Sequence, residues 1–584
     1  MNFNRRLVIN YHEVYGTEKV IDQAAMSTID RLTWARVLAR LNHLARTRKN
    51  YGIIDVLKDW LGSENQAYAN ELLHKIINAY KPTNAHPSSL LLINVWTNLN
   101  LLDRMLSVQA GEAVLDAASS ERELLDIYMA MNGELGEKTS GIFDSVSEAN
   151  HPDTIDRLAR VSLTNLIPYH DINHFKATEL LIAGTIKTYY LFSFLETEHI
   201  ELVNLFLKAY HVESWRDYLK GMLPMAIHGI NEGDGSGLNY LSLKESENKE
   251  QSRKLLDHLA LVDDTLYKIK TDFLNARSNP LFRIDEDTYL VLDAVLAVNR
   301  IYNSVFFELL RLAEKNKQLH QAYNDFFSFY TYEFIEKYLS YQLLDKIFGQ
   351  TSYYRISGAD IVARFGIDTE PDYYVRNGHK VFLFEVKGSM IRGDAKQSFH
   401  YPTVENELKE KYLFNTEDEE NKAIVQLAER IRILFEGGAV YDPNYRSDKI
   451  RVYPILIVSE LALTTPGTNV VMNQWFQAEL EKQEILRNNR SRIADLIIID
   501  LDSLILYAEH FEHQKGLFED SLNAYYAAID RKKIRPKHGV PMNEAYAEEL
   551  MMRTYQPFNG FLHDFIKLQV PALFRQFAVD LIDA

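Results

Sequence analysis

The sequence predicts an α+β protein of several domains: a large, mostly α-helical N-terminal region, an α/β domain with a central mixed sheet, and a helical C-terminal extension. The chain has 584 residues, which at about 150 residues per domain corresponds to roughly two to four domains. Only 25 residues are Gly and 15 are Pro, and this scarcity favours long helices. Near residue 353 the apolar pattern changes from helical to strand-like spacing, which indicates a separate α/β domain.

The first 230 residues are expected to form a helical N-terminal domain. In residues 32–46, apolar side chains recur every three or four positions, as they do on the buried face of an amphipathic helix. Similar spacing occurs in residues 124–131, 178–194 and 200–209. No repeat of fixed period is found, so nothing in the sequence favours a solenoid.

Residues 231–318 are expected to contain a linker, a short hairpin and helices. The linker is the Gly-, Asp- and Ser-rich stretch 231–237. The hairpin covers residues 280–293 and turns at Asp285–Asp287. Helical spacing resumes over residues 294–317.

Residues 319–515 are expected to form the α/β domain, and residues 516–584 the helical C-terminal extension. The order of patterns is helix, strands, helix, strand, helix, strand, which is typical of a compact α/β unit. The segments are a helix at 322–348, strand-like residues 353–387, a helix at 421–435, and apolar strands at 452–458 and 494–499.

The composition excludes several functional classes. With 46% hydrophobic and 25% charged residues, the chain can build real cores and is not disordered in bulk. There is no cysteine, so disulfides, zinc–thiolate sites, cysteine-ligated iron–sulfur clusters and cysteine nucleophiles are impossible. No apolar run approaches the ~20 residues of a membrane span, and the N-terminus lacks a signal-peptide pattern, so we expect a cytoplasmic protein without membrane contact.

The segment that carries chemistry is residues 370–388, EPDYYVRNGHKVFLFEVKG. Asn377-Gly378 is a strong signal for a two-residue hairpin loop. With these two residues as the loop, Asp372 lies opposite Leu383 and diagonal to Glu385, roughly 7 Å away at the backbone. Because side chains alternate along a strand, Asp372, Glu385 and Lys387 then share one face. The apolar residues Phe382, Phe384 and Val386 occupy the other face.

Two carboxylates and an ammonium group on one face of a sheet are typical of a Mg²⁺ site that acts on phosphates. Mg²⁺ prefers oxygen ligands and is commonly held by one or two carboxylates together with water and phosphate oxygens. Lys387 could orient an attacking water or stabilise charge on the phosphate. Mn²⁺ is a plausible substitute for Mg²⁺.

Pro371-Asp372, followed after twelve residues by Glu385-Val386-Lys387, resembles the motif of the PD-(D/E)XK, or restriction-endonuclease-like, nuclease superfamily. The resemblance covers residues 319–515. It implies that Asp372 and Glu385 hold the metal, aided by the Val386 carbonyl, and that Lys387 positions or activates the water.

The resemblance also implies two further site residues. An acidic residue from the preceding helix is expected at the metal, either Glu336 or Glu333, and Glu336 has the more fitting distance to Gly349. A Gln on the following helix is expected at Gln426. The insertion at residues 389–420 departs from the superfamily pattern.

The function implied by the resemblance is Mg²⁺-dependent hydrolysis of phosphodiester bonds, with DNA as the favoured substrate. Prokaryotic restriction or anti-phage defence is the expected setting, with the helical region for recognition, sensing or binding a partner such as an ATPase. Homo-oligomers are compatible with this. Two alternatives remain: an RNA-cleaving nuclease, and an inactive nuclease fold that binds nucleic acid or acts as a scaffold.

Three basic stretches free of acidic residues could contact phosphates, although the formal charge of −17 argues against a nucleic-acid partner on average. A charged stretch can equally be a solvated surface. The candidate contacts are Arg36, Arg40, Arg487, Arg490, Arg531, Lys532, Lys533 and Arg535.

Other patterns favour structural roles. His170 and His174 are spaced like helical metal ligands, but no third ligand is evident. Residues 133–141, GELGEKTSG, lack the spacing and the preceding strand of a phosphate-binding loop and are expected to form an ordinary loop. We therefore expect no nucleotide-binding motif.

Overall fold

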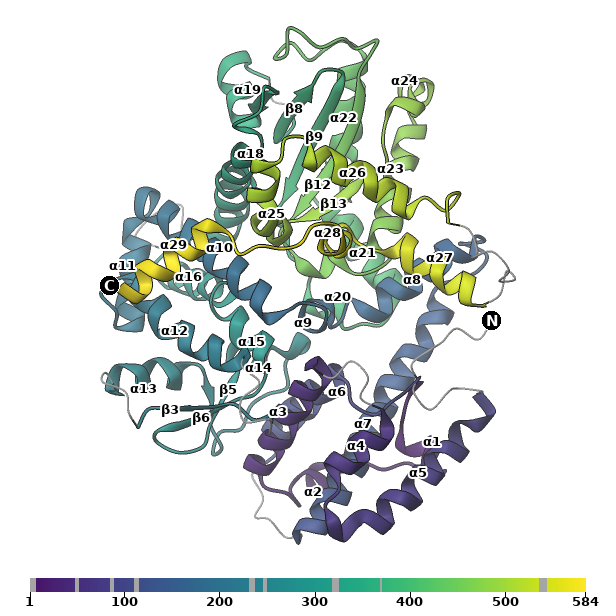
Figure 1. The fold of residues 1–584 in the computed structure, drawn as a ribbon, viewed down its shortest axis with the longest axis vertical. Helices are drawn as coiled ribbons and strands as arrows, with labels where there is room; N and C mark the ends of the chain where they lie inside the picture. Colours follow the sequence, from purple (N-terminus) through teal and green to yellow (C-terminus); the bar gives the residue numbers. More distant parts are fainter. Residues whose placement is uncertain are drawn as a thin grey trace. The chain divides into compact units, whose positions relative to one another are not determined.

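The computed structural model describes residues 7–47, 52–83, 89–109, 115–230, 237–244, 249–317, 325–367, 370–534 and 544–583. The chain forms two compact units whose segments interleave along the sequence (Figure 1). The first unit contains residues 1–141, 172–181 and 207–305, and the second contains residues 142–171, 182–206 and 306–584. Much of the expected linker, residues 231–236, lies outside the described residues.

The first unit is mainly helical, as the apolar spacing predicts. Its central helix is α3, whose buried residues Trp34, Leu38 and Leu41 lie on one face and pack against α6. The helices within this unit are α1 (Tyr11–Tyr15), α2 (Gln23–Met26), α3 (Arg31–Thr47), α4 (Ile53–Trp60), α5 (Gln66–Tyr80), α6 (Val95–Ser107), α12 (Trp215–Ile230), α13 (Lys249–His258), α14 (Leu274–Ser278) and α15 (Ala294–Asn299).

Several helices contain boundaries between the units. They are α7 (Ala117–Ser145), α9 (His170–Asn173), α10 (Ala177–Glu198), α11 (Ile200–Tyr210) and α16 (Asn303–Lys315). Residues 133–141 lie within α7, so the expectation of a loop there is wrong. The helix buries Leu135, between Gly133 and Gly136, and Ile142, directly after Gly141.

The first unit also contains strands. A four-stranded sheet has the order β3-β6-β5-β4, from β3 (Tyr240–Ser242), β4 (Ala260–Leu261), β5 (Leu281–Arg283) and β6 (Thr288–Val291). Strands β5 and β6 are the expected hairpin, with Leu281 opposite Val291. A separate parallel pair joins β1 (Leu7–Val8) and β2 (Leu90–Leu91).

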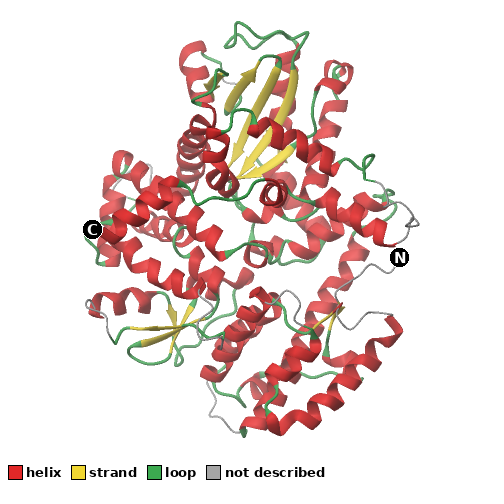
Figure 2. Ribbon diagram, in the orientation of Figure 1, coloured by secondary structure: helices red, strands yellow, loops and turns green. Residues whose placement is uncertain are grey.

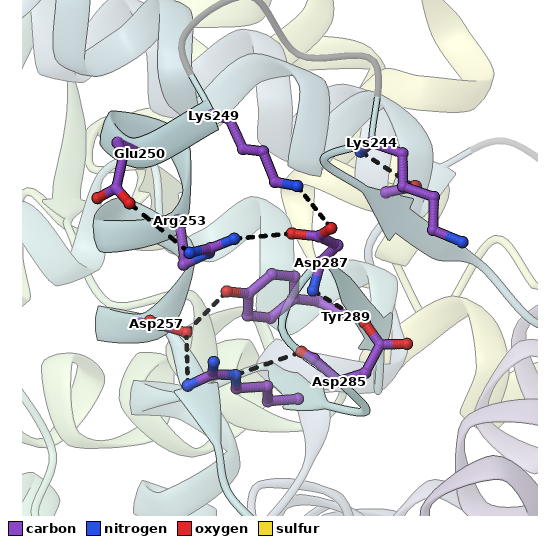
Figure 3. A network of polar contacts seen from close by, with 10 residues as sticks. Lys244, Lys249, Glu250, Arg253, Asp257, Asp285, Asp287 and Tyr289 are labelled. Atoms are coloured by element: carbon purple, nitrogen blue, oxygen red, sulfur yellow. Dashed lines mark hydrogen bonds and ion pairs between the residues drawn. The ribbon is translucent and has the colours of Figure 1, made fainter.

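A network of charges fixes the turn of this hairpin (Figure 3). Asp287 accepts from Lys249 at 2.6 Å and from Arg253 at 2.9 Å, both on α13. Beside it, the Tyr289 hydroxyl donates to Asp257 at 2.7 Å. The two cations hold the pKa of the Asp287 carboxyl below its usual value through hydrogen bonds, so the network tethers α13 to the hairpin.

The second unit is built around a mixed five-stranded sheet with the order β13-β12-β9-β8-β7 (Figure 2). Strand β9 is central, parallel to β12 and antiparallel to β8. The strands are β7 (Tyr354–Ser357), β8 (Tyr373–Asn377), β9 (Lys380–Lys387), β12 (Arg451–Val458) and β13 (Ile497–Asp500). An additional hairpin of β10 (Phe414–Asn415) and β11 (Glu420–Asn421) lies in the insertion.

Both faces of the sheet are buried. Successive side chains of a strand point to opposite faces, and in these strands apolar residues cover both of them. On one face, Phe382 stacks on Tyr453 with ring centroids 5.0 Å apart, and Phe384 packs near Phe348 and Phe518. On the other face, Leu383 and Leu456 belong to a large core. Residues on α22 and α23 complete that core.

The remaining helices of the second unit surround this sheet. One segment, η6, is a π-helix, and α19 occupies residues where strand-like pattern alone was expected. These elements are α8 (Thr154–Leu166), α17 (Phe326–Phe329), η6 (Tyr330–Leu339), α18 (Ser340–Phe348), α19 (Gly358–Phe365), α20 (Gly393–Lys396), α21 (Tyr401–Tyr412), α22 (Ala423–Phe435), α23 (Thr468–Glu481), α24 (Glu484–Asn488), α25 (Leu501–His513), α26 (Leu517–Ile529), α27 (Glu544–Tyr555), α28 (Phe558–Phe565) and α29 (Ala572–Asp583).

The predicted α+β class with a central mixed sheet is confirmed by these elements. Within the described ranges, no helix combines the length and apolar character that a membrane span requires.

Candidate active site

The β8–β9 hairpin has the predicted faces but a different register. Asn377 pairs with Lys380, so Gly378 and His379 form the loop, and Gly378 has φ +60°. The prediction placed the loop one residue earlier, at Asn377-Gly378, and this is wrong. Each cross-strand partner is consequently shifted by two residues, and because the side-chain period is also two, Asp372 and Glu385 remain on one face.

Glu385 is fully buried near the end of β9. Its carboxylate forms an ion pair with Lys387 at 2.8 Å and a second ion pair with Arg430 of α22. Neither oxygen of Glu385 has a well-directed hydrogen bond. Two cations therefore neutralise the buried charge, and both carboxylate oxygens can still accept hydrogen bonds or bind a metal ion.

Arg430 is a site residue that sequence reasoning missed. It lies on a helix whose neighbours Leu427, Ile431 and Leu434 are fully buried, and only 14% of its side chain is exposed. Burial lowers the pKa of the Arg430 guanidinium, while Asp372 and Glu370 act in the opposite direction. Its position four residues after Gln426, on the same helix face, is the signal that could have identified it.

Asp372 precedes β8 and points to the end of β9. Its Oδ2 accepts a hydrogen bond from the backbone N–H of Val386 at 2.6 Å. The carboxylate is thereby held beside the residue that follows Glu385. Val386 itself is buried in the ladder, opposite Ile457 of β12.

Glu336 reaches the same strand end from the π-helix η6. Its Oε1 accepts from the backbone N–H of Gly388 at 3.0 Å. Burial raises the pKa of the Glu336 carboxyl, nearby Lys387 lowers it, and Asp372 raises it. Glu333 instead pairs with Lys337 at 3.2 Å, so Glu336 is the one of the two glutamates that approaches Asp372 and Lys387. π-Helical segments frequently occur at functional sites.

Gln426 lies on α22 one turn before Arg430, and its Oε1 is buried without a hydrogen-bond partner. Strand β9 packs against this helix. The insertion between Lys387 and α22 contains α20, α21 and the small β10–β11 hairpin, and it does not displace α22 from the sheet.

The residues at this strand end suit a hard divalent cation. The buried oxygens of Glu385 accept no directed hydrogen bond. Asp372 and Glu336 each accept one hydrogen bond from a backbone N–H through a single carboxylate oxygen. Among the described residues, no group of three or more acidic or histidine side chains is placed so that it could hold a metal ion by itself. Mg²⁺ does not need such a group, because it commonly uses one or two carboxylates with water and phosphate oxygens.

The basic stretch of the first unit is partly structural. Arg31 is buried and donates to backbone carbonyls, including that of Thr265 at 2.9 Å. Arg46 forms a 2.6 Å ion pair with Asp293, whose side chain is fully buried. Arg36 is exposed and Arg40 is partly exposed on α3. These two remain candidates for phosphate contact.

The basic residues of the second unit are mostly engaged within the chain. Arg487 donates to the carbonyl of Glu481, and Arg490 pairs with Asp495 at 2.9 Å. Arg531 forms ion pairs with Asp153 and Asp156.

Two lysines follow Arg531. Lys533 lies 3.7 Å from Asp530, and Lys532 is exposed. Arg535 lies outside the described residues. Arg490, Arg531, Lys532 and Lys533 line a single cavity, so the structure brings together two stretches that are about 40 residues apart in sequence.

No protein-family model matches the sequence, and neither a curated protein nor a solved structure shows significant similarity to it.

Proposed function

We propose that the protein is a metal-dependent nuclease of the restriction-endonuclease-like type, with DNA as the first candidate substrate. The observation that supports this most strongly is the gathering of Glu336, Asp372, Glu385 and Lys387 at one end of β9. A row of apolar residues would stabilise the sheet at lower cost, because each buried charge must be compensated. The retained charges therefore favour a chemical role.

In this proposal Asp372 and Glu385 hold Mg²⁺ or Mn²⁺, with Glu336 and the Val386 carbonyl as further oxygen ligands. When bound, the metal supplies Lewis-acid stabilisation of the negative charge that develops on the phosphate. The backbone N–H groups of Val386 and Gly388 orient two of these carboxylates in advance.

Lys387 has a separate role. Its ammonium group lies 2.8 Å from Glu385 and on the same face. From there it would donate a hydrogen bond to a phosphate oxygen or to the attacking water. Gln426, with an unpartnered Oε1, would help to position that water, and Arg430 would hold Glu385 in place.

The setting we propose is restriction or anti-phage defence. The helical parts of the chain would recognise substrate, sense a trigger or bind a companion protein such as an ATPase. RNA is the alternative substrate, because a metal held by carboxylates can act on either phosphodiester backbone.

A second candidate function is a non-catalytic nucleic-acid-binding or scaffold protein. The ion pair between Arg430 and Glu385 favours it, because an internal guanidinium already supplies positive charge at a carboxylate proposed to hold the metal. The two candidates differ in one testable property, since only the nuclease needs Glu385 to bind a divalent cation.

The test is a cleavage assay on plasmid, linear duplex, single-stranded DNA and RNA, each with Mg²⁺, Mn²⁺ or EDTA. We expect metal-dependent cleavage of at least one substrate by the wild type. Lys387→Ala should reduce the rate by at least about a hundredfold, which is the scale of a lost charge-stabilising group in a catalytic site.

Glu333→Ala is the matched control, because Glu333 lies on the same helix as Glu336 but pairs with Lys337. It should cleave like the wild type. Equal rates for wild type and Lys387→Ala on a cleaved substrate, with Glu385→Ala also unchanged, would contradict the nuclease proposal.

A further inference from the structure

A cavity of about 680 Å³ lies in the second unit, beside the edge strand β13. Its walls come from the start of β12, the residues before β13, and helices α23, α26 and α27, which are labelled in Figure 1. This volume is within the range of small-molecule sites, which commonly occupy about 300–1,000 Å³. The cavity is not part of the candidate active site, because neither Glu385 nor Lys387 lines it.

The lining is rich in positive charge, in a protein whose formal charge is −17. Five cations line the cavity, namely Arg451, Arg490, Arg531, Lys532 and Lys533, together with two carboxylates, Asp495 and Asp530. An excess of one sign of charge on a concave surface concentrates ligands of the opposite sign.

Two of these cations have no counter-ion among the described residues. Arg451 is exposed and lies over the ring of Tyr453, and Lys532 is exposed next to Arg531. Arg490, by contrast, already pairs with Asp495. Arg451 and Lys532 are therefore available for an incoming anion.

Three side-chain amides on the lining use their oxygens to accept hydrogen bonds from within the chain. The oxygen of Asn473 accepts from the N–H of Leu496 at 2.9 Å, and that of Gln474 accepts from Arg160 at 2.7 Å. The oxygen of Asn523 accepts from the Tyr453 hydroxyl at 3.3 Å. Since an amide that uses its oxygen in this way leaves its NH₂ group free to donate, the lining presents donors. None of these NH₂ groups has an acceptor within the part of the chain that the structure describes.

Two buried polar atoms on the lining also lack partners. The Thr554 hydroxyl belongs to a residue that is only 4% exposed, and it makes no hydrogen bond. The Oδ1 of Asn469 is buried and makes none either. Because buried polar groups are nearly always satisfied, these two atoms indicate that a polar ligand or water completes the site.

We infer that this cavity binds a phosphate-bearing ligand, with Arg451 and Lys532 pairing with the phosphate oxygens and the amide NH₂ groups donating to them. The Oδ1 of Asn469 would accept from an N–H of the ligand. Phosphate with a polar body of this kind occurs in free nucleotides and in a nucleic-acid strand. The inference does not require that the protein cleaves nucleic acid.

The cavity is well separated from the candidate active site along the sheet. Arg451 begins β12 and pairs with Lys380, whereas Leu456 pairs with Glu385. Five residues of a strand span about 17 Å at about 3.3 Å per residue. A strand of nucleic acid bound in this cavity would thus contact the protein here, several nucleotides from the site of cleavage. A free nucleotide bound here would be a ligand separate from the substrate.

The experiment is calorimetric binding to the full chain in EDTA, where metal-dependent cleavage cannot occur. The probes are ADP, for the free nucleotide, and single-stranded DNA of about 12 nucleotides, within the usual site sizes for such strands. We expect at least one probe to bind the wild type. The double variant Arg451→Glu/Lys532→Glu should weaken that binding at least about tenfold and reduce its salt dependence.

Arg364→Glu/Lys515→Glu is the matched control, because it makes the same charge change at exposed positions outside the cavity. Binding is measured in EDTA and does not require cleavage, which separates this test from the nuclease proposal. Lys532→Ala, which only truncates an exposed side chain, should give an intermediate loss.

Loss of ADP binding alone would assign the cavity to a free nucleotide, and loss of DNA binding alone would assign it to a strand. The inference is overturned if neither probe binds the wild type, or if the cavity variant binds both probes as the control variant does.

Discussion

A fully buried carboxylate such as Glu385 needs compensating charge, and here Lys387 and Arg430 provide it. The alternation of side chains along a strand was sufficient to predict that Asp372, Glu385 and Lys387 share a face. It was not sufficient to predict Arg430, because that residue lies on a helix and an arginine in an amphipathic helix is usually solvated. Its spacing of four residues from Gln426 was the one available signal.

Asp103, in α6, offers a test of residue burial in the first unit. Burial raises the pKa of its carboxyl to about 6, opposed by a hydrogen bond from Asn275. Because the folded pKa is above the unfolded value, ionisation of Asp103 costs stability as the pH rises through about 6. Asp103→Asn should therefore raise the melting temperature at about pH 7.5, and should increase the free energy of unfolding by up to about 3 kcal/mol.

At about pH 4.5 the gain should fall to about 1 kcal/mol, since Asp103 is then largely protonated in the folded state. Differential scanning calorimetry at both pH values provides the measurement. Glu286→Gln is the control, because Glu286 is exposed, and it should show no such pH dependence. An equal gain for Asp103→Asn at both pH values would contradict the proposed titration.

Arg46 lies on the same helix as the candidate phosphate contacts Arg36 and Arg40, yet it pairs with the buried Asp293. Arg46→Met should reduce the free energy of unfolding by about 3–5 kcal/mol, because it leaves a buried carboxylate without its partner. Arg36→Met, an exposed position on the same helix, should change it by less than about 0.5 kcal/mol. Denaturant titration measures both, and similar effects of the two variants would show that the ion pair is unimportant.

At the scale of elements, turn chemistry determines the limits of prediction. Asn377-Gly378 correctly indicated a hairpin, but the chain uses Gly378 at positive φ as the first loop residue and keeps Asn377 in β8. Each cross-strand partner is shifted by two residues, which leaves every side chain on its predicted face of the sheet. Helix α19, over Gly358–Phe365, was missed between two strands, although Ser357 caps it through the N–H of Asp360. In α7 the glycines of residues 133–141 predicted a loop, but the segment is helical, because packing outweighs the low helix propensity of glycine.

The contact between η6 and the end of β9 can be tested with Gly388. A Cβ at Gly388 would lie 2.9–3.0 Å from atoms of Thr331, so Gly388→Ala should push the π-helix away and break the hydrogen bond to Glu336. We expect metal-dependent cleavage to fall at least about tenfold, with a stability loss of about 1–3 kcal/mol.

Gly136→Ala is the control for Gly388→Ala, because a Cβ at Gly136 would meet no atom within 4 Å beyond the neighbouring backbone of its own helix. It should keep full activity and gain roughly 0.5–1 kcal/mol, as expected for alanine in a helix. Full cleavage activity in a folded Gly388→Ala variant would remove Glu336 from the site.

At the scale of the whole molecule, the interleaving of the two units could not be predicted from consecutive patterns along the chain. The expected domains were consecutive, whereas α8 belongs to the second unit, with the five-stranded sheet. Leu163 and Ile167 are part of the core that includes Leu383, and Arg160 donates to Gln474 at 2.7 Å. Such pairings join residues more than 200 positions apart, and local spacing carries no information about them.

This interleaving predicts the behaviour of a fragment. Residues 306–584 expressed alone should be insoluble or lack a cooperative melting transition, because the core residues that cover Leu163 and Ile167 would be exposed. Co-expression with residues 142–206 should restore soluble protein. Solubility and calorimetry provide the measurements, and cooperative melting of the 306–584 fragment alone would contradict the described core.

The net charge of −17 says little about how charge is distributed over the molecule. It coexists with a cavity lined by five cations and with carboxylates that are consumed by internal pairs, such as those of Asp293 and Glu385. An average charge therefore does not exclude a phosphate-bearing partner, because the distribution of charge over the surface decides where such a partner can bind.

The central claim, that the end of β9 is a divalent-metal site, is tested most directly by Mn²⁺ binding to the full chain without any substrate, measured by calorimetry. The claim predicts that the wild type and Glu333→Gln bind Mn²⁺ alike, and that Asp372→Asn and Glu385→Gln each weaken binding at least about tenfold. Failure of the folded wild type to bind Mn²⁺, or unchanged binding in both folded site variants, would contradict it.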